Sequence, residues 1–274
     1  MWPSRSTEPP AQRLALTLIG TYLRSRVRAL WRILCCLWHV LHGLWVIRTQ
    51  FPRWSEAQRG ERIRQWATDM LRIAGLRVQV SGEPPVPSTP VLVVCNHISW
   101  LDILVMQSVY PVRFVSKADV AGWPLIGSLV TGSGTVLIER ERRSDVLRVI
   151  QIMAEHLRQG EALAVFPEGT TGDTGPHGHT VLRFHANLIQ AAIDAQTPIQ
   201  PWALKYHDQR TGAQTHAADF VGDTTLMASI WSVLCAEPMT AKVHCGESRV
   251  HEAAERKVIA QGLHGEVGGL LRRM

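Results

Sequence analysis

The chain has 274 residues, of which 46% are apolar and 19% charged, enough for one large α/β domain plus an appendage. Its formal net charge of +6 indicates an anionic partner: a membrane surface, a nucleic acid, or an acidic carrier protein or cofactor. The five cysteines include no C-x-x-C pair and no His/Cys cluster at zinc spacing, which argues against a zinc site and indicates a reducing compartment.

The N-terminal region divides into a polar stretch and an apolar one. Residues 1–11 are polar and contain proline, so we predict that they are disordered. No short apolar stretch with a small-residue cleavage site follows, so we predict no signal peptide. Residues 12–54 are predicted to form a membrane-associated helical segment, because residues 29–47 are mostly apolar and long enough to span a bilayer.

The helix predicted over 29–47 has two distinct faces. Trp31, Trp38 and Trp45 recur every seven residues and so form one stripe, and tryptophan prefers the membrane–water interface. Another face carries the residues Arg32, Cys35, His39 and His42. This pattern favours a helix that lies in the interface over one that spans the bilayer, with the arginines marking the cytoplasmic side. A helix of the domain core is the alternative interpretation.

The remainder of the chain alternates helices and strands. Capping-box spacing at Ser55 and Gln58 predicts a helix that ends near Gly75. Apolar runs bounded by turn residues predict strands over 76–80, 91–95, 112–115, 135–138, 162–166, 198–204 and 241–245. Further helices are predicted up to about residue 109 and over 125–130, 144–159, 184–195, 225–234 and 251–273. The predicted fold class is therefore α/β, with a mixed, largely parallel sheet flanked by helices over 55–274 and an N-terminal membrane-associated helical segment.

A histidine and an aspartate lie five residues apart just after the strand over 91–95. Inside one continuous helix, side chains at this spacing would point about 140° apart, so His97 and Asp102 fit better on either side of a helix start. Ser99 has capping-box spacing to Asp102 and is the predicted N-cap. A carboxylate on one imidazole nitrogen fixes the tautomer and makes the other nitrogen a better base. The same spacing also fits a helix cap beside an incidental histidine.

Polar residues follow other predicted strands, and these residues are Lys117, Arg140, Glu168 and Thr170. The carboxyl ends of strands line the ligand crevice in an α/β sheet, so these residues are predicted to share one site with His97. A base, cations, a carboxylate and hydroxyls suit acyl transfer onto the hydroxyl of an anionic substrate. Backbone N–H groups would stabilise the oxyanion.

An acyl-enzyme mechanism is not favoured. No Gly-x-Ser-x-Gly elbow occurs, which argues against a nucleophilic serine. Cys95 is a candidate nucleophile by residue type, but its place at the end of an apolar strand favours a buried thiol.

Four short motifs occur in order over about residues 76–205. The first is Asn-His-x-Ser-x-x-Asp, at Asn96, His97, Ser99 and Asp102. The second is Gly-x-x-aromatic-Ile-x-Arg, at Gly134, Ile138 and Arg140, with Leu137 in place of the aromatic residue. The third is Phe-Pro-Glu-Gly-Thr at 166–170, and the fourth is Ile199 with Pro201. In this order and spacing the chain resembles the glycerolipid acyltransferase family, whose members acylate glycerol-3-phosphate, lysophosphatidate and related lysolipids.

The resemblance implies specific roles. His97 would be the general base with Asp102 orienting it, and Arg140 would hold the phosphate of the acceptor. Glu168 and its neighbour Gly169 would position that acceptor. Together with the residues at the strand ends, the full set of predicted substrate-binding residues is Asn96, Ser99, Lys117, Arg140, Glu168, Gly169, Thr170 and Thr171. The acyl donor would be acyl-CoA or acyl carrier protein, with no metal or cofactor. The resemblance also implies attachment to the inner membrane, with the catalytic domain facing the cytoplasm.

The sequence leaves more than one lysolipid as the candidate acceptor. Lysophosphatidate, converted to phosphatidic acid, is the default. However, Thr171-Gly172-Asp173 follows the third motif, where many lysophosphatidate acyltransferases have Arg or Ser. This variant resembles enzymes that acylate lyso-ornithine lipids or lysophospholipids that already carry a headgroup. A non-catalytic lipid-binding membrane protein is the alternative of another class. A nucleic-acid binder is not favoured, because the arginines flank an apolar helix and no nucleic-acid motif occurs.

Overall fold

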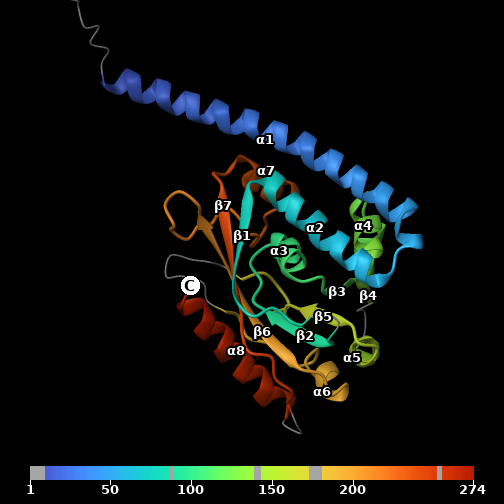
Figure 1. The fold of residues 1–274 in the computed structure, drawn as a ribbon. Helices are drawn as coiled ribbons and strands as arrows, with labels where there is room; N and C mark the ends of the chain where they lie inside the picture. The colour runs from blue at the N-terminus through green and yellow to red at the C-terminus, as the bar shows by residue number, and fades with distance from the viewer. Residues whose placement is uncertain (1–9, 87–88, 139–142, 173–180, 252–254) are drawn as a thin grey trace, which may run out of the picture.

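A computed structural model describes residues 10–86, 89–138, 143–172, 181–251 and 255–274 (Figure 1). The described strands form one seven-stranded sheet in the order β1-β7-β6-β2-β5-β3-β4. They are β1 (Leu76–Gly82), β2 (Val91–Cys95), β3 (Arg113–Lys117), β4 (Val136–Ile138), β5 (Ala162–Val165), β6 (Ile199–Asp208) and β7 (Met239–Cys245). All neighbouring pairs are parallel except β6 and β7, which are antiparallel. The predicted mixed, largely parallel sheet is confirmed.

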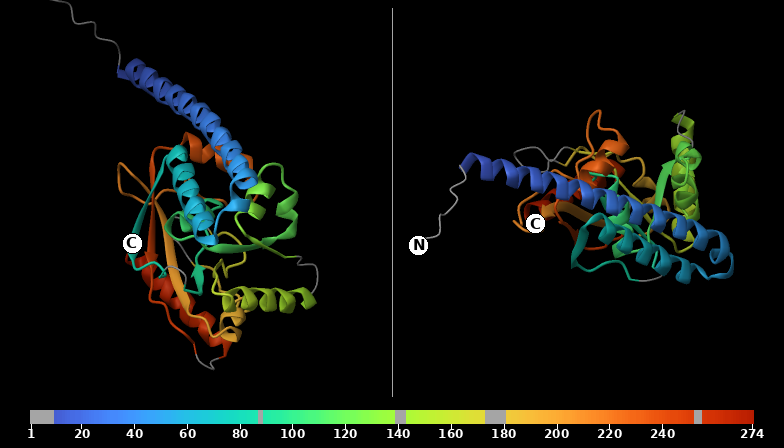
Figure 2. Two further views of the ribbon diagram at one scale, coloured as in Figure 1. Left: turned by 45° about the vertical axis from the view of Figure 1, so that its right-hand side comes forward. Right: turned by 90° about the horizontal axis from the view of Figure 1, so that it is seen from above.

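Helices cover both faces of this sheet. The helices α2 (Glu56–Ala74), α3 (Leu101–Val109) and α7 (Leu226–Cys235) contribute to one core cluster, and α5 (Arg143–Arg158), α6 (Gln190–Asp194) and α8 (Arg256–Arg272) to the other. The 3₁₀ helix η2 (Ala118–Gly122) and α4 (Ile126–Gly132) connect β3 to β4. The long helix α1 (Pro10–Thr49) is followed by the 3₁₀ helix η1 (Phe51–Arg53). Helix α1 runs over the outside of the layer that contains α2 and α7, at the opposite end of the molecule from α8 (Figures 1 and 2).

The central strand β2 is the rigid base of the functional region. All five of its residues are buried, because alternate side chains enter the two core clusters: Val93 and Cys95 on one face, Leu92 and Val94 on the other. Such a strand has no freedom to slip, since a shift of one residue would exchange its two faces. The loop that follows Cys95 therefore starts from a fixed point.

The polar face of α1 packs against the protein. Arg32 is 9% exposed and donates to the carbonyl oxygens of Leu234 (2.9 Å) and Ala236 (3.2 Å), at the C-terminal end of α7. Farther along α1, the Nε2 atom of His39 bonds the Trp66 carbonyl of α2 at 3.0 Å. The two Arg32 bonds satisfy carbonyls at the end of α7, which lack intrahelical partners. The face of α1 that carries Arg32 and His39 thus contacts α7 and α2.

Several predicted boundaries differ from the structure. α1 begins at Pro10, inside the stretch predicted to be disordered, and proline is well tolerated in a first helical turn. The predicted helix over 184–195 is reduced to α6, because residues 181–189 are irregular and the N–H of His185 bonds the Pro167 carbonyl at 2.8 Å. Strand β6 extends to Asp208 instead of ending at residue 204, because its outer half pairs with β7. The last helix begins at Arg256, five residues later than predicted.

Candidate active site

His97 and Asp102 form a hydrogen-bonded pair across the start of α3. The Nδ1 atom of His97 lies 2.8 Å from Oδ2 of Asp102, and the same oxygen accepts the backbone N–H groups of Ile98 (2.6 Å) and Ser99 (2.9 Å). The Asp102 side chain is fully buried, whereas that of His97 is 19% exposed. Because Nδ1 is engaged and Nε2 bonds no described residue, Nε2 is the nitrogen available to take a proton.

The imidazole ring of His97 is held from its face as well as from its edge. It stacks on Phe166 with ring centroids 3.9 Å apart and planes 9° apart. Phe166 in turn stacks on Phe114 of β3, with centroids 5.7 Å apart. Two constraints at right angles, a hydrogen bond and a ring stack, leave the ring one orientation.

Ser99 does not cap α3 in the predicted way. The helix begins at Leu101, its N-cap is Trp100, and the Ser99 hydroxyl accepts the Leu101 N–H at 3.4 Å. Only half of the capping box is present, the bond from the Ser99 N–H to Asp102. The other half is missing because the Asp102 N–H donates to the Ser99 carbonyl at 3.1 Å instead of to the Ser99 hydroxyl.

The side chains of Asn96 and Ser99 bond other parts of the protein. Both are 0% exposed. The Asn96 amide accepts the N–H of Leu204 (2.8 Å) and donates to its carbonyl (3.0 Å), so it joins the end of β2 to β6. The position of these residues does not support the predicted substrate contact; Asn96 holds two strands together.

Glu168 connects the histidine loop to a distant segment. One carboxylate oxygen accepts the His97 N–H (3.0 Å) and the other accepts the Leu182 N–H (3.1 Å), and the residue is 3% exposed. Burial raises the pKa of Glu168 to about 7, although both backbone hydrogen bonds oppose the shift. Both oxygens already have protein partners, so the structure places Glu168 as a brace for His97.

The burial of Glu168 predicts a pH-dependent stability. The folded state holds the Glu168 proton more tightly than the unfolded state, so the contribution is complete below pH 4.5 and is lost as the pH rises through about 7. The loss is at most about 3 to 4 kcal/mol, at about 1.4 kcal/mol per pKa unit. Denaturant unfolding of the wild type and Glu168→Gln, compared between pH 5 and pH 8, is expected to show a smaller decrease for the variant. Glu155→Gln, at an exposed glutamate of α5, should keep the wild-type decrease, and equal decreases in all three proteins would contradict the assignment.

The other residues of the third motif shape the loop. Gly169 has φ +73°, a left-handed conformation that favours glycine, and a Cβ there would lie 3.4 Å from the His185 ring. Thr170 is exposed, whereas the Thr171 hydroxyl donates to the Phe220 carbonyl. The Gly172 N–H donates to the His97 carbonyl at 2.7 Å. The loop is thus tied directly to the loop of His97.

The side chains of the two predicted cations, Lys117 and Arg140, lie outside the described part of the structure. Lys117 is the last residue of β3, in register with Ile138 of β4, but its side chain lies outside the described part of the structure. Arg140 lies outside the described residues altogether. The C-terminal ends of β2, β3, β4 and β5 nevertheless point to the same edge of the sheet, as predicted.

Cys95 has the properties of an inert thiol. It is 0% exposed, and burial together with the nearby Asp102 and Glu168 carboxylates raises the pKa of its thiol well above the usual value. A thiol that resists ionisation is a poor nucleophile, which agrees with the prediction of a buried structural cysteine.

The backbone N–H groups beside the histidine are already occupied. Those of His97, Ile98 and Ser99 donate to the Glu168 and Asp102 carboxylates. They therefore cannot serve as the predicted oxyanion donors, which must come from other groups.

Sequence reasoning missed Tyr206. Its hydroxyl donates to Oδ1 of Asp102 at 2.7 Å, from a strand that was predicted to end at residue 204. The local sequence offers one signal, the alternation of large buried side chains at 202, 204 and 206, which share the face that packs on α3.

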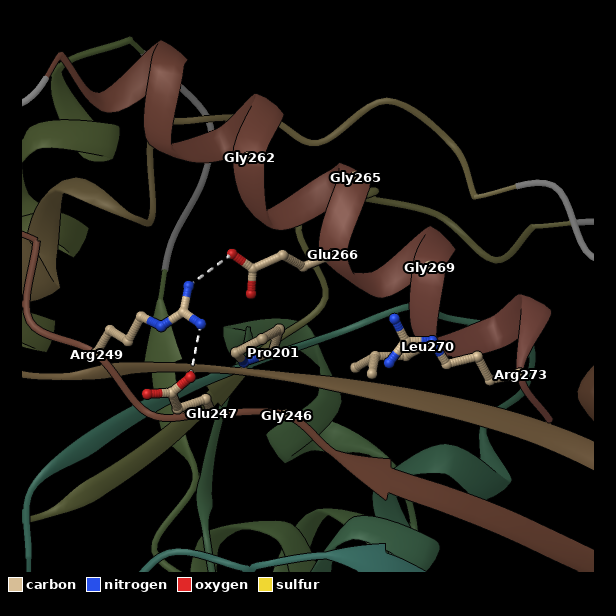
Figure 3. A pocket seen from close by; sticks show the side chains of 10 residues that line it. All are labelled: Pro201, Gly246, Glu247, Arg249, Gly262, Gly265, Glu266, Gly269, Leu270 and Arg273. Atoms are coloured by element: carbon tan, nitrogen blue, oxygen red, sulfur yellow. Dashed lines mark hydrogen bonds and ion pairs between the residues drawn. The ribbon is translucent and has the colours of Figure 1, made fainter.

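A cavity of about 510 Å³ lies between α8 and the ends of β6 and β7 (Figure 3). At its rim Arg249 bonds Glu247 (2.6 Å) and Glu266 (3.5 Å). Pro201 of the fourth motif lines it, and a Cβ on Gly246 would lie 2.8 Å from the Pro201 carbonyl oxygen. None of the residues around His97 lines this cavity, so the fourth motif has a packing role here.

Known proteins resemble the chain in sequence and fold. A family model named Acyltransferase matches residues 77–205. A lyso-ornithine lipid O-acyltransferase of Pseudomonas aeruginosa is 33% identical over 243 residues, which cover 86% of this chain and 91% of that protein. A 1-acyl-sn-glycerol-3-phosphate acyltransferase of Neisseria gonorrhoeae is 35% identical over 173 residues, covering 62% and 66%. The crystal structure of the 1-acyl-sn-glycerophosphate acyltransferase PlsC from Thermotoga maritima has the same fold, with a TM-score of 0.67, 20% identity and coverage of 91% and 97%.

Proposed function

Because the chain belongs to the Acyltransferase family, we propose that it transfers a fatty acyl group from a thioester donor to the free hydroxyl of a lysolipid. The donor is acyl-CoA or acyl carrier protein, and no further cofactor takes part. The observation that carries this proposal is the buried Asp102 on Nδ1 of a partly exposed His97, which leaves Nε2 free as the general base.

The proposed reaction uses one proton carrier for both steps. Nε2 of His97 takes the proton of the acceptor hydroxyl while the oxygen attacks the thioester carbonyl carbon. The tetrahedral intermediate then collapses, the C–S bond breaks, and the imidazolium returns the proton to the leaving thiolate. Asp102 stabilises the imidazolium between the two steps without becoming protonated itself.

We propose lyso-ornithine lipid as the preferred acceptor and lysophosphatidate as the second candidate. The relative that matches nearly from end to end is a lyso-ornithine lipid acyltransferase, whereas the lysophosphatidate enzyme matches a shorter stretch. The Thr171 hydroxyl, after the third motif, is bonded to the Phe220 carbonyl and brings no charge to the loop. Lysophosphatidate remains supported by the N. gonorrhoeae relative.

We propose that α1 attaches the enzyme to the inner membrane as a monotopic helix, with the catalytic domain in the cytoplasm. Within the described residues, one helix, over Tyr22–Arg53, is long and apolar enough to cross a bilayer by length and composition. Its polar face is bonded to α7 and α2 at Arg32 and His39, whereas Trp31 and Trp38 point outward. A helix held lengthwise against the domain lies along the membrane surface, with the tryptophans immersed.

An acceptor panel tests this function. The purified full chain, given labelled acyl-CoA or acyl carrier protein, is offered lyso-ornithine lipid, lysophosphatidate and lysophosphatidylglycerol side by side. We expect lyso-ornithine lipid to have the largest kcat/KM, by about tenfold or more, which is a difference of 1.4 kcal/mol in transition-state binding. A preference for lysophosphatidate would refute the acceptor assignment. No transfer to any acceptor from either donor would favour a non-catalytic lipid-binding protein.

A further inference from the structure

The carboxylate of Asp102 has a fourth hydrogen bond that the histidine pair does not explain. Three N–H donors, from His97, Ile98 and Ser99, converge on Oδ2. The other oxygen, Oδ1, accepts the hydroxyl of Tyr206 at 2.7 Å. Tyr206 is 2% exposed and lies on β6, one residue beyond the stretch that the family model matches.

We propose that Tyr206 is a positioning residue for acyl transfer, acting through Asp102, and this rests on the proposed acyltransferase function. A carboxylate turns easily about its last torsion when only one of its oxygens is held. With Oδ2 fixed by three donors and Oδ1 by the Tyr206 hydroxyl, the plane of the Asp102 carboxylate is set. The direction of the His97–Asp102 bond, and hence the position of Nε2, is then fixed.

Burial keeps Tyr206 in the donor form. The pKa of its hydroxyl is raised well above the usual value by burial and by the adjacent negative charge of Asp102. The phenol therefore keeps its proton throughout the pH range of an enzyme assay. It donates to the carboxylate and does not compete for the proton that His97 transfers.

Asn96 fixes the position of Tyr206 along β6, and hence its position beside Asp102. Both amide atoms of Asn96 bond the backbone of Leu204, two residues before Tyr206 on the same face of β6. This clamp fixes the register of β6 against the end of β2. The asparagine of the first motif and the tyrosine thus act together, although 110 positions separate them.

Tyr206→Phe tests the proposal, because it keeps the ring and removes only the hydroxyl. We expect kcat to fall about tenfold to a hundredfold, the range for a lost hydrogen bond to a charged group, with the KM for the acceptor nearly unchanged. We also expect the acidic limb of the kcat/KM profile to move to higher pH, because a carboxylate with one donor fewer stabilises the imidazolium more strongly. Tyr110→Phe is the matched control: it removes a hydroxyl that bonds the Val86 carbonyl at 3.2 Å, and it should keep wild-type kinetics.

A second measurement applies if Tyr206→Phe folds poorly. In a Tyr22→Phe/Tyr110→Phe background, Tyr206 is the sole tyrosine, so 3-fluorotyrosine labels it alone. The more acidic phenol donates more strongly, and we expect the acidic limb to move to lower pH. The positioning role alone would be overturned if the wild type is active and neither Tyr206→Phe nor the fluorotyrosine protein changes kcat or the acidic limb of the kcat/KM profile. An inactive wild type would instead overturn the proposed function.

Discussion

Replacement of His97 by alanine is expected to lower kcat for acyl transfer by roughly 10²–10⁴-fold, the usual contribution of a general base. The imidazole is the group whose free Nε2 can deprotonate the acceptor, and its removal leaves the hydroxyl a poor nucleophile. The KM for the lysolipid should change little, because His97 acts mainly in the transition state. Steady-state kinetics on detergent-dispersed lysolipid with labelled thioester measures both constants. Normal turnover would refute the base mechanism.

His156 provides a matched control inside the same protein. Its Nδ1 lies 2.7 Å from Oε2 of Glu161, again five positions later in the chain. This second pair lies before β5, at the opposite end of that strand from Phe166, and Glu161 is also bonded by Arg113. His156→Ala should therefore retain wild-type kcat and lose only some stability. If His97→Ala and His156→Ala lose kcat equally, the loss at His97 reflects a damaged fold and not the loss of a general base.

Asp102→Asn distinguishes an orienting carboxylate from a helix cap. An amide cannot accept on its nitrogen, so at least one of the bonds from His97, Ile98, Ser99 or Tyr206 is lost. We expect a loss of kcat of about 10²-fold or more, with the wrong imidazole tautomer favoured. A variant that loses stability but keeps kcat would show that Asp102 serves only the helix start.

The two histidine–carboxylate pairs show what spacing alone can predict. A separation of five residues placed His97 near Asp102, and it also occurs at His156 and Glu161, away from the candidate site. The first pair is set apart in the sequence because a buried strand leads into it and two other motifs follow strand ends. The fold class and the His97–Asp102 pair were predictable since apolar runs, turn residues and motif order are local features of the chain.

Contacts between distant segments were not predictable. Glu168 was expected to position the acceptor, but Leu182 occupies its second oxygen, and no local pattern marks Leu182 as a donor. Tyr206 depends on a strand that continues only because β7 pairs with its outer half. In both cases tertiary partners decide the role of the side chain.

Helix α1 shows the same limit on a larger scale. The seven-residue tryptophan repeat predicted an amphipathic helix, and the periodicity separated its faces correctly. It could not show that Arg32 is opposite the last carbonyls of α7, because those carbonyls lie about 200 residues later. The sequence therefore did not predict which elements the polar face contacts. Because that face is bonded to α7 and α2, the tryptophan face is the one left for the proposed membrane contact.

Replacement of Trp31 and Trp38 by glutamate is therefore expected to release the enzyme from membranes. These side chains are 68% and 72% exposed, so the substitutions should cost little folding energy. A tryptophan buries roughly 150–250 Å². At about 25 cal/mol per Å², partial immersion of each contributes on the order of 2 kcal/mol. Co-sedimentation of the Trp31→Glu/Trp38→Glu variant with anionic liposomes should show binding weakened roughly 10²–10³-fold, at 1.4 kcal/mol per tenfold.

Leu147→Glu/Val258→Glu is the control with the same change in charge. Both side chains are similarly exposed, at 63% and 59%, but they lie on α5 and α8, away from α1 (Figure 1). If the tryptophan face of α1 is the membrane contact, this control should bind liposomes almost as the wild type does. The tryptophan variant should keep wild-type kcat on detergent-dispersed lysolipid, because neither tryptophan contacts the His97 pair. Equal weakening by both variants would mean that net charge governs attachment, and no weakening by either would place the membrane contact on another surface.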